Sequence, residues 1–178
     1  FKRGQLDQEM NLLGAETDTN SRGYLQLDDS TNGCLHFWWE EGGTVTSLKT
    51  NRLFRDVSAW YHVVVAYDTS QATDTNRVKI YINGTQETSF ATATYPPQDA
   101  ITCPWNIDGY NCSVGAQKGG GGSYGTFFDG YQAETVFIDG TQYTASDFGE
   151  FDSDSPTIWK PIDVSGLTFG TNGFYLDF

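Results

Sequence analysis

The feature that most constrains this chain is a regular succession of short strand patterns separated by turn signals. Arg77–Ile82 alternates apolar and polar residues, and Asn83-Gly84 follows it directly. An Asn-Gly pair in that position favours a tight β-hairpin turn, here into residues 85–89. Trp60–Tyr67 is apolar on both faces, as a central strand covered on both sides requires. Strand patterns at this spacing predict a β-sandwich or a β-barrel.

Four further stretches are predicted as strands by the same criteria: Tyr24–Asp28, Cys34–Glu40, Thr44–Leu48 and Gly130–Asp139. Thr144–Asp147 pairs a capping residue with a carboxylate three positions later, which predicts one helical turn that ends near Gly149. Residues 92–124 contain Pro96-Pro97 and four consecutive glycines. We expect that stretch to be a long, mostly irregular loop.

Composition supports an all-β fold and excludes several function classes. Aromatic residues make up 15% of the 178 residues and glycine occurs 20 times, which argues against a helical bundle. The net charge of -13 disfavours binding to nucleic acid and to anionic membranes. The chain shows no apolar run near the ~18 residues of a spanning helix, so no membrane insertion is expected. Without a domain linker, residues 1–178 are predicted to form a single domain.

The three cysteines leave two interpretations open. Cys103 and Cys112 bracket a short loop with Pro104 and Gly109, which is sterically compatible with a disulfide bond. The alternative is free thiols in a reducing compartment. Together with Cys34, the cysteines lack the paired spacing of a zinc site.

Three segments resemble known proteins. Arg55–Asp68 and Arg77–Gly84 resemble the Trp-x-His strand and the following Asn-Gly hairpin of laminin-G-like domains, in the concanavalin A-like lectin/glucanase superfamily. Gly130–Gly140 followed by Ala145–Glu150 is similar to the closing strand and short helix of the same domains. The end of the chain, Gly170–Phe178, resembles a version found in bacteriophage virion proteins, often tail fibres.

The resemblance implies an all-β concanavalin A-like jelly roll, that is, a sandwich of two antiparallel sheets with one short helix. It also implies a non-catalytic binding module on the surface of a virion, outside the cell, that contacts host-surface glycans. Such proteins are often homo-oligomers, trimers among them. Two alternatives stay open: a purely structural decoration or assembly domain that contacts other virion subunits, and a glycoside hydrolase.

The candidate glycan site follows from strand alternation. Within 34–40, the odd-numbered residues face one way and the even-numbered residues the other, so Trp38 is expected on a sheet surface with Tyr81 and Tyr24. Sugars stack on aromatic rings while neighbouring polar groups bind their hydroxyls. The candidate glycan-binding residues are Trp38, Tyr81, Trp105, Asp108, Tyr110 and Tyr124. The alternative is that these aromatics pack under the long loop or against a neighbouring subunit.

No catalytic residue is predicted. The nearest match to a glucanase strand is Glu150–Asp154, which ends in Asp rather than Glu and is interpreted as a solvated acidic loop. His62 is interpreted as a hydrogen-bonded interior residue. His36 shares a strand face with Cys34, but nothing supplies the orienting group that a Cys-His nucleophile needs.

Calcium is a candidate ligand, since carboxylates in loops suit this hard cation. The candidate ligands are Asp28, Asp29, Asp152 and Asp154. The alternative is that these are ordinary aspartates at turns.

The beginning of the chain resembles the point in related domains where one strand ends and the next begins, at Phe1–Gly4 and Met10–Ala15. We therefore expect the domain to lack one or more earlier strands. Phe174–Phe178 would then present an unpaired apolar edge, which favours pairing with another segment or subunit.

Overall fold

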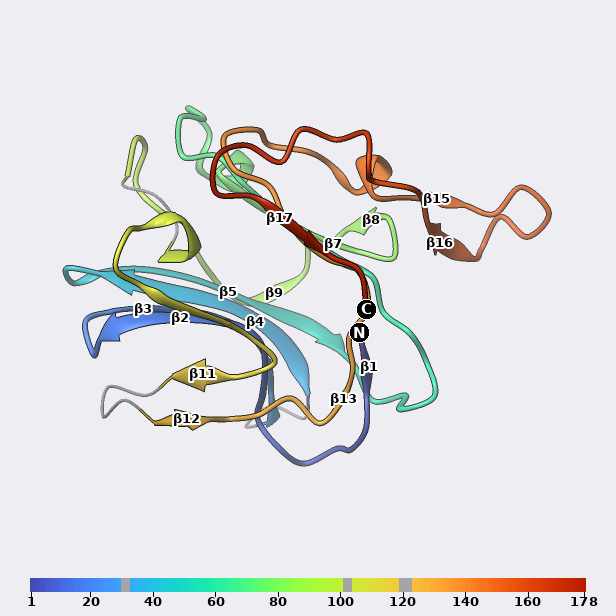
Figure 1. The fold of residues 1–178 in the computed structure, drawn as a ribbon, viewed down its shortest axis with the longest axis horizontal. Helices are drawn as coiled ribbons and strands as arrows, with labels where there is room; N and C mark the ends of the chain where they lie inside the picture. The colour runs from blue at the N-terminus through green and yellow to red at the C-terminus, as the bar shows by residue number, and fades with distance from the viewer. Residues whose placement is uncertain (30–32, 101–103, 119–122) are drawn as a thin grey trace.

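The computed structural model describes residues 1–29, 33–100, 104–118 and 123–178. Two layers of antiparallel strands face each other (Figure 1). The first layer is a continuous six-stranded sheet in the order β10-β2-β3-β4-β5-β9. Its strands are β10 (Asn111–Val114), β2 (Met10–Asp18), β3 (Ser21–Asp28), β4 (Cys34–Glu41), β5 (Thr44–Leu53) and β9 (Phe90–Thr94).

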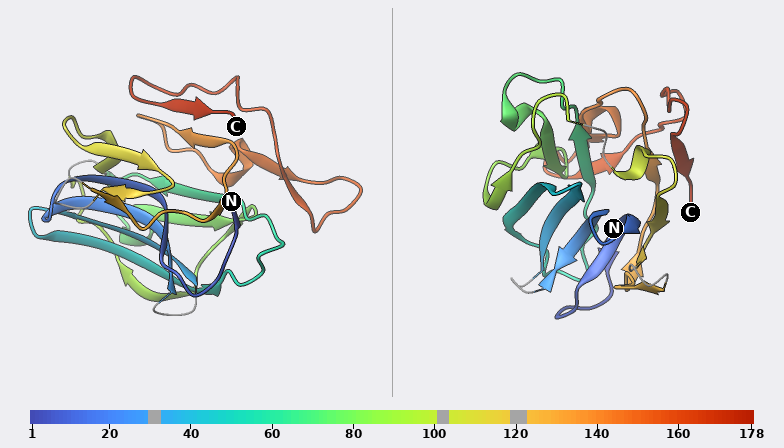
Figure 2. Two further views of the ribbon diagram at one scale, coloured as in Figure 1. Left: turned by 60° about the horizontal axis from the view of Figure 1, so that its bottom comes forward. Right: turned by 90° about the vertical axis from the view of Figure 1, so that its left-hand side faces the viewer.

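The second layer is in two pieces, which the views in Figure 2 separate from the six-stranded sheet. One piece comprises β6 (Val63–Tyr67), β7 (Val78–Ile82) and β8 (Thr85–Gln86); the other pairs β14 (Thr135–Phe137) with β17 (Phe174–Leu176). The remaining strands pair as β1 (Lys2–Arg3) with β13 (Gly130–Tyr131), β11 (Gln117–Lys118) with β12 (Tyr124–Gly125), and β15 (Gly149–Phe151) with β16 (Trp159–Pro161). Short 3-10 turns are η2 (Asp74–Asn76), η3 (Pro104–Asn106) and η4 (Ala145–Asp147).

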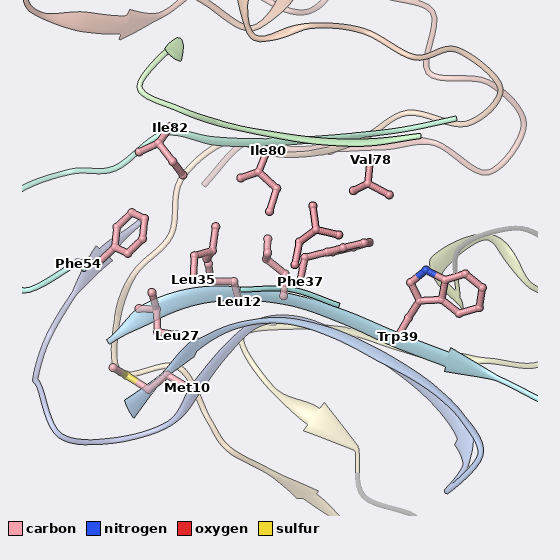
Figure 3. Close-up of a cluster of buried hydrophobic side chains, with 12 residues drawn as sticks. Met10, Leu12, Leu27, Leu35, Phe37, Trp39, Phe54, Val78, Ile80 and Ile82 are labelled. Carbon is pink, nitrogen blue, oxygen red and sulfur yellow. The ribbon is translucent and has the colours of Figure 1, made fainter. Parts of the chain in front are cut away.

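The hydrophobic core lies between the two layers because alternate side chains of each strand point inward. Figure 3 shows side chains from β7 meeting those from β3 and β4. The buried cluster comprises Met10, Leu12, Leu25, Leu27, Leu35, Phe37, Trp39, Leu48, Phe54, Val78, Ile80 and Ile82. The intervening residues of the six-stranded sheet therefore point away from the second layer, and we call that side the outer face.

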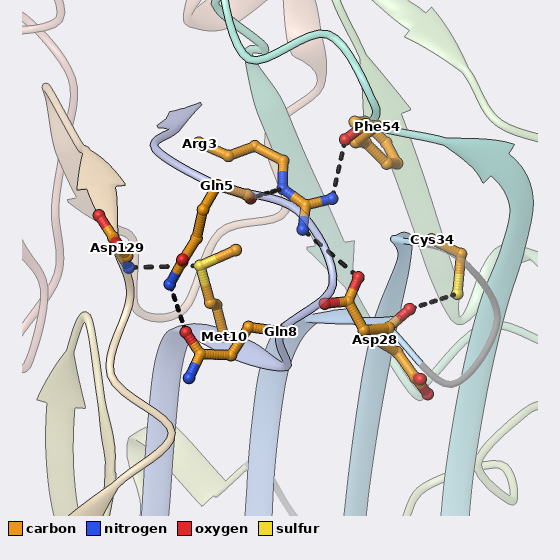
Figure 4. Close-up of polar contacts among 9 residues, drawn as sticks. Arg3, Gln5, Gln8, Met10, Asp28, Cys34, Phe54 and Asp129 are labelled. Carbon is orange, nitrogen blue, oxygen red and sulfur yellow. Dashed lines mark hydrogen bonds and ion pairs between the residues drawn. The ribbon is translucent and has the colours of Figure 1, made fainter.

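A buried guanidinium joins three parts of the first layer (Figure 4). Arg3 is 1% exposed, and its Nη1 donates to the carbonyl of Phe54 at 2.9 Å. Its Nε donates to Gln5 O at 3.0 Å, and Nη2 lies 3.4 Å from the carboxylate of Asp29. A buried charge is tolerated when it is paired and hydrogen-bonded in this way, so Arg3 is a structural residue.

The predicted all-β sandwich and its hairpin are confirmed. Asn83 and Gly84 have φ values of 49° and 77°, as a two-residue hairpin turn requires. The Asn83 Oδ1 accepts a hydrogen bond from the backbone N–H of His62 at 2.8 Å. The Trp159 indole N–H donates to His62 Nδ1 at 3.1 Å, so His62 is hydrogen-bonded as predicted, although it is half-buried and not fully interior.

Several predicted boundaries are wrong for a common reason. The stretch 92–124, expected to be mostly irregular, contains β10, which pairs with β2 at the edge of the six-stranded sheet. Gly130–Asp139 forms two strands, not one, and Glu134 between them has a positive φ of 53°. The predicted single helical turn is confirmed as η4, capped by Thr144 and Asp147. Pairing with a distant strand decides the boundaries that are wrong, and local sequence does not encode it.

The expectation that the last strand lacks a partner is wrong for Phe174–Leu176. These residues pair with β14 in the register Phe137↔Phe174 and Thr135↔Leu176. Among the described residues, no helix is long and apolar enough to cross a membrane.

Gly84→Ala tests the contact that joins the hairpin to the C-terminal segment. A Cβ at Gly84 would lie 2.2 Å from the Trp159 ring, whereas a Cβ at Gly42 meets nothing within 4 Å. Both glycines have positive φ, so Gly42→Ala measures backbone strain alone, about 1 kcal/mol. We expect Gly84→Ala to lower the free energy of unfolding by about 2–4 kcal/mol in urea titrations. Equal losses in the two variants would contradict the packing of Trp159 on this turn.

Candidate functional site on the outer face

Two aromatic rings form the centre of the outer face. Tyr24 on β3 pairs directly with Trp38 on β4, and their rings stack with centroids 5.0 Å apart. The guanidinium of Arg22, on the same face of β3, lies 5.3 Å from the centroid of the Trp38 ring. The paired strands thus present an aromatic surface with a cation beside it, a combination that contacts planar or C–H-rich ligands.

The segment that carries β11 lies directly on this face. Gly14 of β2 makes that approach feasible, since a Cβ there would lie 2.6 Å from the carbonyl oxygen of Ala116. The side chain of Asn11 donates to Gln117 Oε1 at 3.3 Å, which also holds the segment to β2. In Figure 1, β11 and β12 lie on the side of the sheet opposite the second layer.

A pocket of about 290 Å³ lies between the outer face and the β11–β12 hairpin. It is lined by Glu16, Arg22, Gln117, Ser123, Tyr124, Gly125 and Thr126. Glu16 is 3% exposed, and neither of its carboxylate oxygens has a hydrogen-bond partner among the described residues. The Nε of Arg22 is likewise buried without a partner there.

Burial governs the titration of this pocket. It raises the pKa of the Glu16 carboxyl, while the Arg22 charge and the side chain of Gln117 oppose that rise. Burial also raises the pKa of Tyr24 to about 12, so its hydroxyl stays protonated and able to donate a hydrogen bond. The pocket therefore offers unused acceptors and donors in a desolvated setting, which suits a ligand with hydroxyl groups.

A second polar group on the outer face is centred on Asp28, whose carboxylate is paired within the chain. Lys49 Nζ lies 2.7 Å from the Asp28 carboxylate, and His36 Nδ1 lies 3.6 Å from the same oxygen. The other ring nitrogen, Nε2, is 2.9 Å from Ser47 Oγ. Burial lowers the pKa of His36 to about 4, so the ring is neutral at pH 7.

The candidate calcium ligands do not converge. Asp28 faces Lys49, and Asp29 faces Arg3, so a cation of the chain already occupies each carboxylate. Asp152 accepts the backbone N–H groups of Asp154 and Ser155 at 2.9 and 3.0 Å, in a local turn. Within the described ranges, no group of three or more His, Cys, Asp or Glu side chains could hold a metal.

The predicted glycan-binding residues are divided among several surfaces. Trp38 lies on the outer face, and Tyr124 lines the pocket beside Arg22. Tyr81 alternates with the buried Ile80 and Ile82 on β7, so it points out of the other layer. The prediction that Trp38 and Tyr81 share one surface is therefore wrong, because β4 and β7 belong to opposite sheets.

The loop residues lie apart from Trp38 as well. Trp105 stacks on Phe37, whose side chain points into the core, with ring centroids 5.8 Å apart. Tyr110 hydrogen-bonds the carboxylate of Glu41 at the end of β4, and Asp108 is exposed between them in the chain.

Sequence reasoning missed Glu16, Arg22 and Gln117. A signal for them was present in the alternation of Arg22 with Tyr24, and in the glycine at position 14 within an apolar strand. A glycine inside a strand often marks the close approach of another backbone.

The structure describes two of the three cysteines, Cys34 and Cys112. Cys103 lies outside the described residues, so its predicted bond to Cys112 stays a prediction. Cys112 is exposed on β10, and burial of its sulfur nonetheless raises the pKa of the thiol. Cys34 is buried, and its thiol lies 3.9 Å from the carbonyl oxygen of Asp28.

The family model of the concanavalin A-like lectin/glucanases superfamily matches residues 1–139, which is most of the chain. The protein belongs to this superfamily. The match spans the whole six-stranded sheet and ends just beyond β14. Searches against curated proteins and against solved structures returned no match.

The two histidines make stability depend on pH. Burial lowers the pKa of His36 and of His62 to about 4, from an ordinary value of 6.5. Between pH 6.5 and 4 the unfolded chain therefore binds protons that the folded chain does not. The free energy of unfolding should fall as pH drops through this window, by up to about 1.4 kcal/mol per pH unit for each histidine.

Urea titrations from pH 7 to 4 measure this loss, and His62→Gln should reduce its slope. The raised pKa of Glu16 acts in the opposite direction, so comparison with the His62→Gln variant isolates the histidine contribution. NMR titration that placed both histidine pKa values near 6.5 would contradict the burial argument.

Proposed function

We propose that this protein is a non-catalytic carbohydrate-binding module whose ligand occupies the pocket over Glu16 and Arg22 and the adjoining rings. One observation carries the proposal: a buried carboxylate and a buried guanidinium nitrogen, beside an aromatic pair, have no hydrogen-bond partner among the residues that the structure describes. An unsatisfied buried polar group costs about 1–3 kcal/mol, and a bound ligand would remove that cost.

A pyranose matches the chemistry of the site. Its hydroxyls can donate to Glu16 and accept from Arg22, and its C–H face can contact Trp38, Tyr24 or Tyr124. The net charge of -13 favours a neutral sugar over an anionic one. Membership of a superfamily of lectins and glucanases supports the same ligand class.

The absence of catalysis is also a proposal. A retaining glycosidase needs two carboxyl groups about 5 Å apart, one of them protonated. In the nearest sequence match, Glu150 and Asp152 both lie near Lys160, at 3.3 and 3.5 Å. The backbone N–H groups of Asp154 and Ser155, together with the charge of Lys160, lower the pKa of Asp152, which is the wrong direction for an acid catalyst. Release of reducing sugar from a polysaccharide by the protein would overturn the proposal that it is not a catalyst.

We further propose that the module works on the surface of a bacteriophage particle and contacts glycans of the host. The resemblance of the last nine residues to virion proteins and the acidic, aromatic-rich composition support this setting. A structural role among virion subunits is the second candidate, favoured by exposed aromatics such as Tyr131 and Phe127, 66% and 63% accessible. Failure to bind any sugar on a glycan array, together with self-association in solution, would favour this second role.

Trp38→Ala tests the aromatic surface. Stacking of a ring on a planar ligand contributes about 1–3 kcal/mol, so affinity for a glycan-array hit should fall about tenfold or more by calorimetry. Tyr81→Ala is the matched control, since it removes a ring from the outward side of the other layer. Equal effects of the two substitutions, or no effect of Trp38→Ala, would exclude this face.

Glu16→Gln tests the pocket with two opposite readouts. The substitution keeps the shape but removes a buried charge whose oxygens accept no hydrogen bond from the described residues, so the free energy of unfolding should rise by about 1 kcal/mol. Affinity for the sugar should fall about tenfold, because an amide cannot replace both acceptor oxygens. Glu150→Gln, at an exposed carboxylate, should change neither quantity. A Glu16→Gln variant that was less stable and bound normally would mean that Glu16 is structural.

A further inference from the structure

Glu16 and Arg22 are opposite charges on neighbouring strands that do not bond to each other. They occupy one register position of β2 and β3, where side chains on the same face start about 5 Å apart. Such a pair ordinarily closes into an ion pair. Among the described residues, however, both oxygens of Glu16 and the Nε of Arg22 are buried without a hydrogen-bond partner. An acceptor and a donor are thus left open side by side in the same pocket.

The contacts of Arg22 and Gln117 explain why the pair stays open. The guanidinium of Arg22 lies 5.3 Å from the centroid of the Trp38 ring, on the side of β3 opposite β2, and this cation–π contact holds it there. The Oε1 of Gln117 accepts from Asn11, so its side-chain nitrogen is the group that it can offer to the pocket. These groups are therefore held in place before a ligand binds, which lowers the cost of binding.

The charges around the pocket balance one another. The groups that act on the Glu16 carboxyl through their charge are Arg22, Asp18 and Lys118. Together with Glu16, two anions stand against two cations, so the surroundings attract neither an anion nor a cation strongly. Bringing a charged group out of water is costly without such attraction. The pocket therefore favours a neutral group that carries one donor and one acceptor.

We propose that the group bound between Glu16 and Arg22 is the acetamido group of an N-acetylated sugar. This inference rests on the proposed carbohydrate-binding function and narrows its ligand class. The amide N–H donates to Glu16 and the amide carbonyl accepts from the Nε of Arg22, so one planar group satisfies both residues. A hydroxyl carries its donor and its acceptor on one oxygen, and would have to draw both side chains to that atom. An amide carries them on two atoms, which suits side chains that are held apart.

The rest of the sugar has a place at the rim of the pocket. Tyr124 lines the pocket and is 50% exposed, so its ring can contact the C–H face of a pyranose. At the next residue, Gly125, an added Cβ would meet nothing within 4 Å. Open space therefore lies beside the Tyr124 ring for the substituents of the sugar.

The test compares three trisaccharides of the same linkage that differ only in the substituent at the second carbon of each ring. Chitotriose carries acetamido groups, its deacetylated form carries ammonium groups, and cellotriose carries hydroxyls. By calorimetry we expect chitotriose to bind about tenfold more tightly than either of the others, because only its substituent satisfies both Glu16 and Arg22 without a net charge.

Each contrary result has a distinct meaning. Equal affinities for chitotriose and cellotriose, or tighter binding of the deacetylated form, would overturn the acetamido assignment and leave the carbohydrate-binding function standing. On a glycan array the bound glycans should carry N-acetyl groups, and hits that lack them would likewise overturn the assignment alone. An array without any hit would overturn the proposed function and this inference together.

Arg22→Lys tests the donor. Lysine keeps the positive charge but has no counterpart of Nε, so the preference for chitotriose over cellotriose should shrink from about tenfold to about twofold or less. Arg52→Lys is the matched control, because the Nε of this arginine on the same sheet already donates to Glu87 at 2.7 Å; it should keep the full preference. The readout is a ratio of two affinities on one sample, so partial unfolding does not change it. An unchanged ratio in Arg22→Lys would overturn the assignment.

Discussion

The alternation of side chains along β4 is the constraint on which the rest of the structure depends. Phe37 and Trp39 enter the core between the layers, so Trp38 must face outward beside Tyr24. A slip of one residue in the pairing of β3 with β4 would turn the core-facing aromatic residues toward solvent. It would also turn the charged residues of the outer face into the core. The same pairing that stabilises the sandwich therefore also sets the candidate site.

Local chemistry explains how much of the fold was predictable. The Asn83-Gly84 turn, the all-β class and the hydrogen-bonded role of His62 follow from short-range patterns, and all three are confirmed. Which sheet each strand joins is decided by pairing between distant segments. For this reason the outward direction of Trp38 was predictable, whereas its separation from Tyr81 was not. The pocket residues escaped prediction because the docking of β11 on Gly14 joins segments about 100 residues apart.

The buried Arg3 and the half-buried Arg22 show how a structural charge differs from a candidate functional one. Arg3 contacts two carbonyls and a carboxylate, so its burial is compensated within the chain. Within the described part of the chain, the Nε of Arg22 has no acceptor, and both carboxylate oxygens of the nearby Glu16 have no donor. Folding alone gives no benefit from such unmatched groups, since each costs free energy in the absence of a ligand. This contrast, more than the presence of aromatics, is why we propose the outer face as the binding surface.

The two layers differ in how easily segments can be added to them without changing the candidate site. The six-stranded sheet is continuous, and one face of it carries the site while the other carries the core. The second layer is in two pieces, and residues 140–178, beyond the family match, add to it through β17 and through Trp159 on His62. Changes in that layer reach the site only across the packed core, which resists deformation. Attachment or assembly through the second layer can therefore proceed while the geometry of Glu16, Arg22 and Trp38 is preserved.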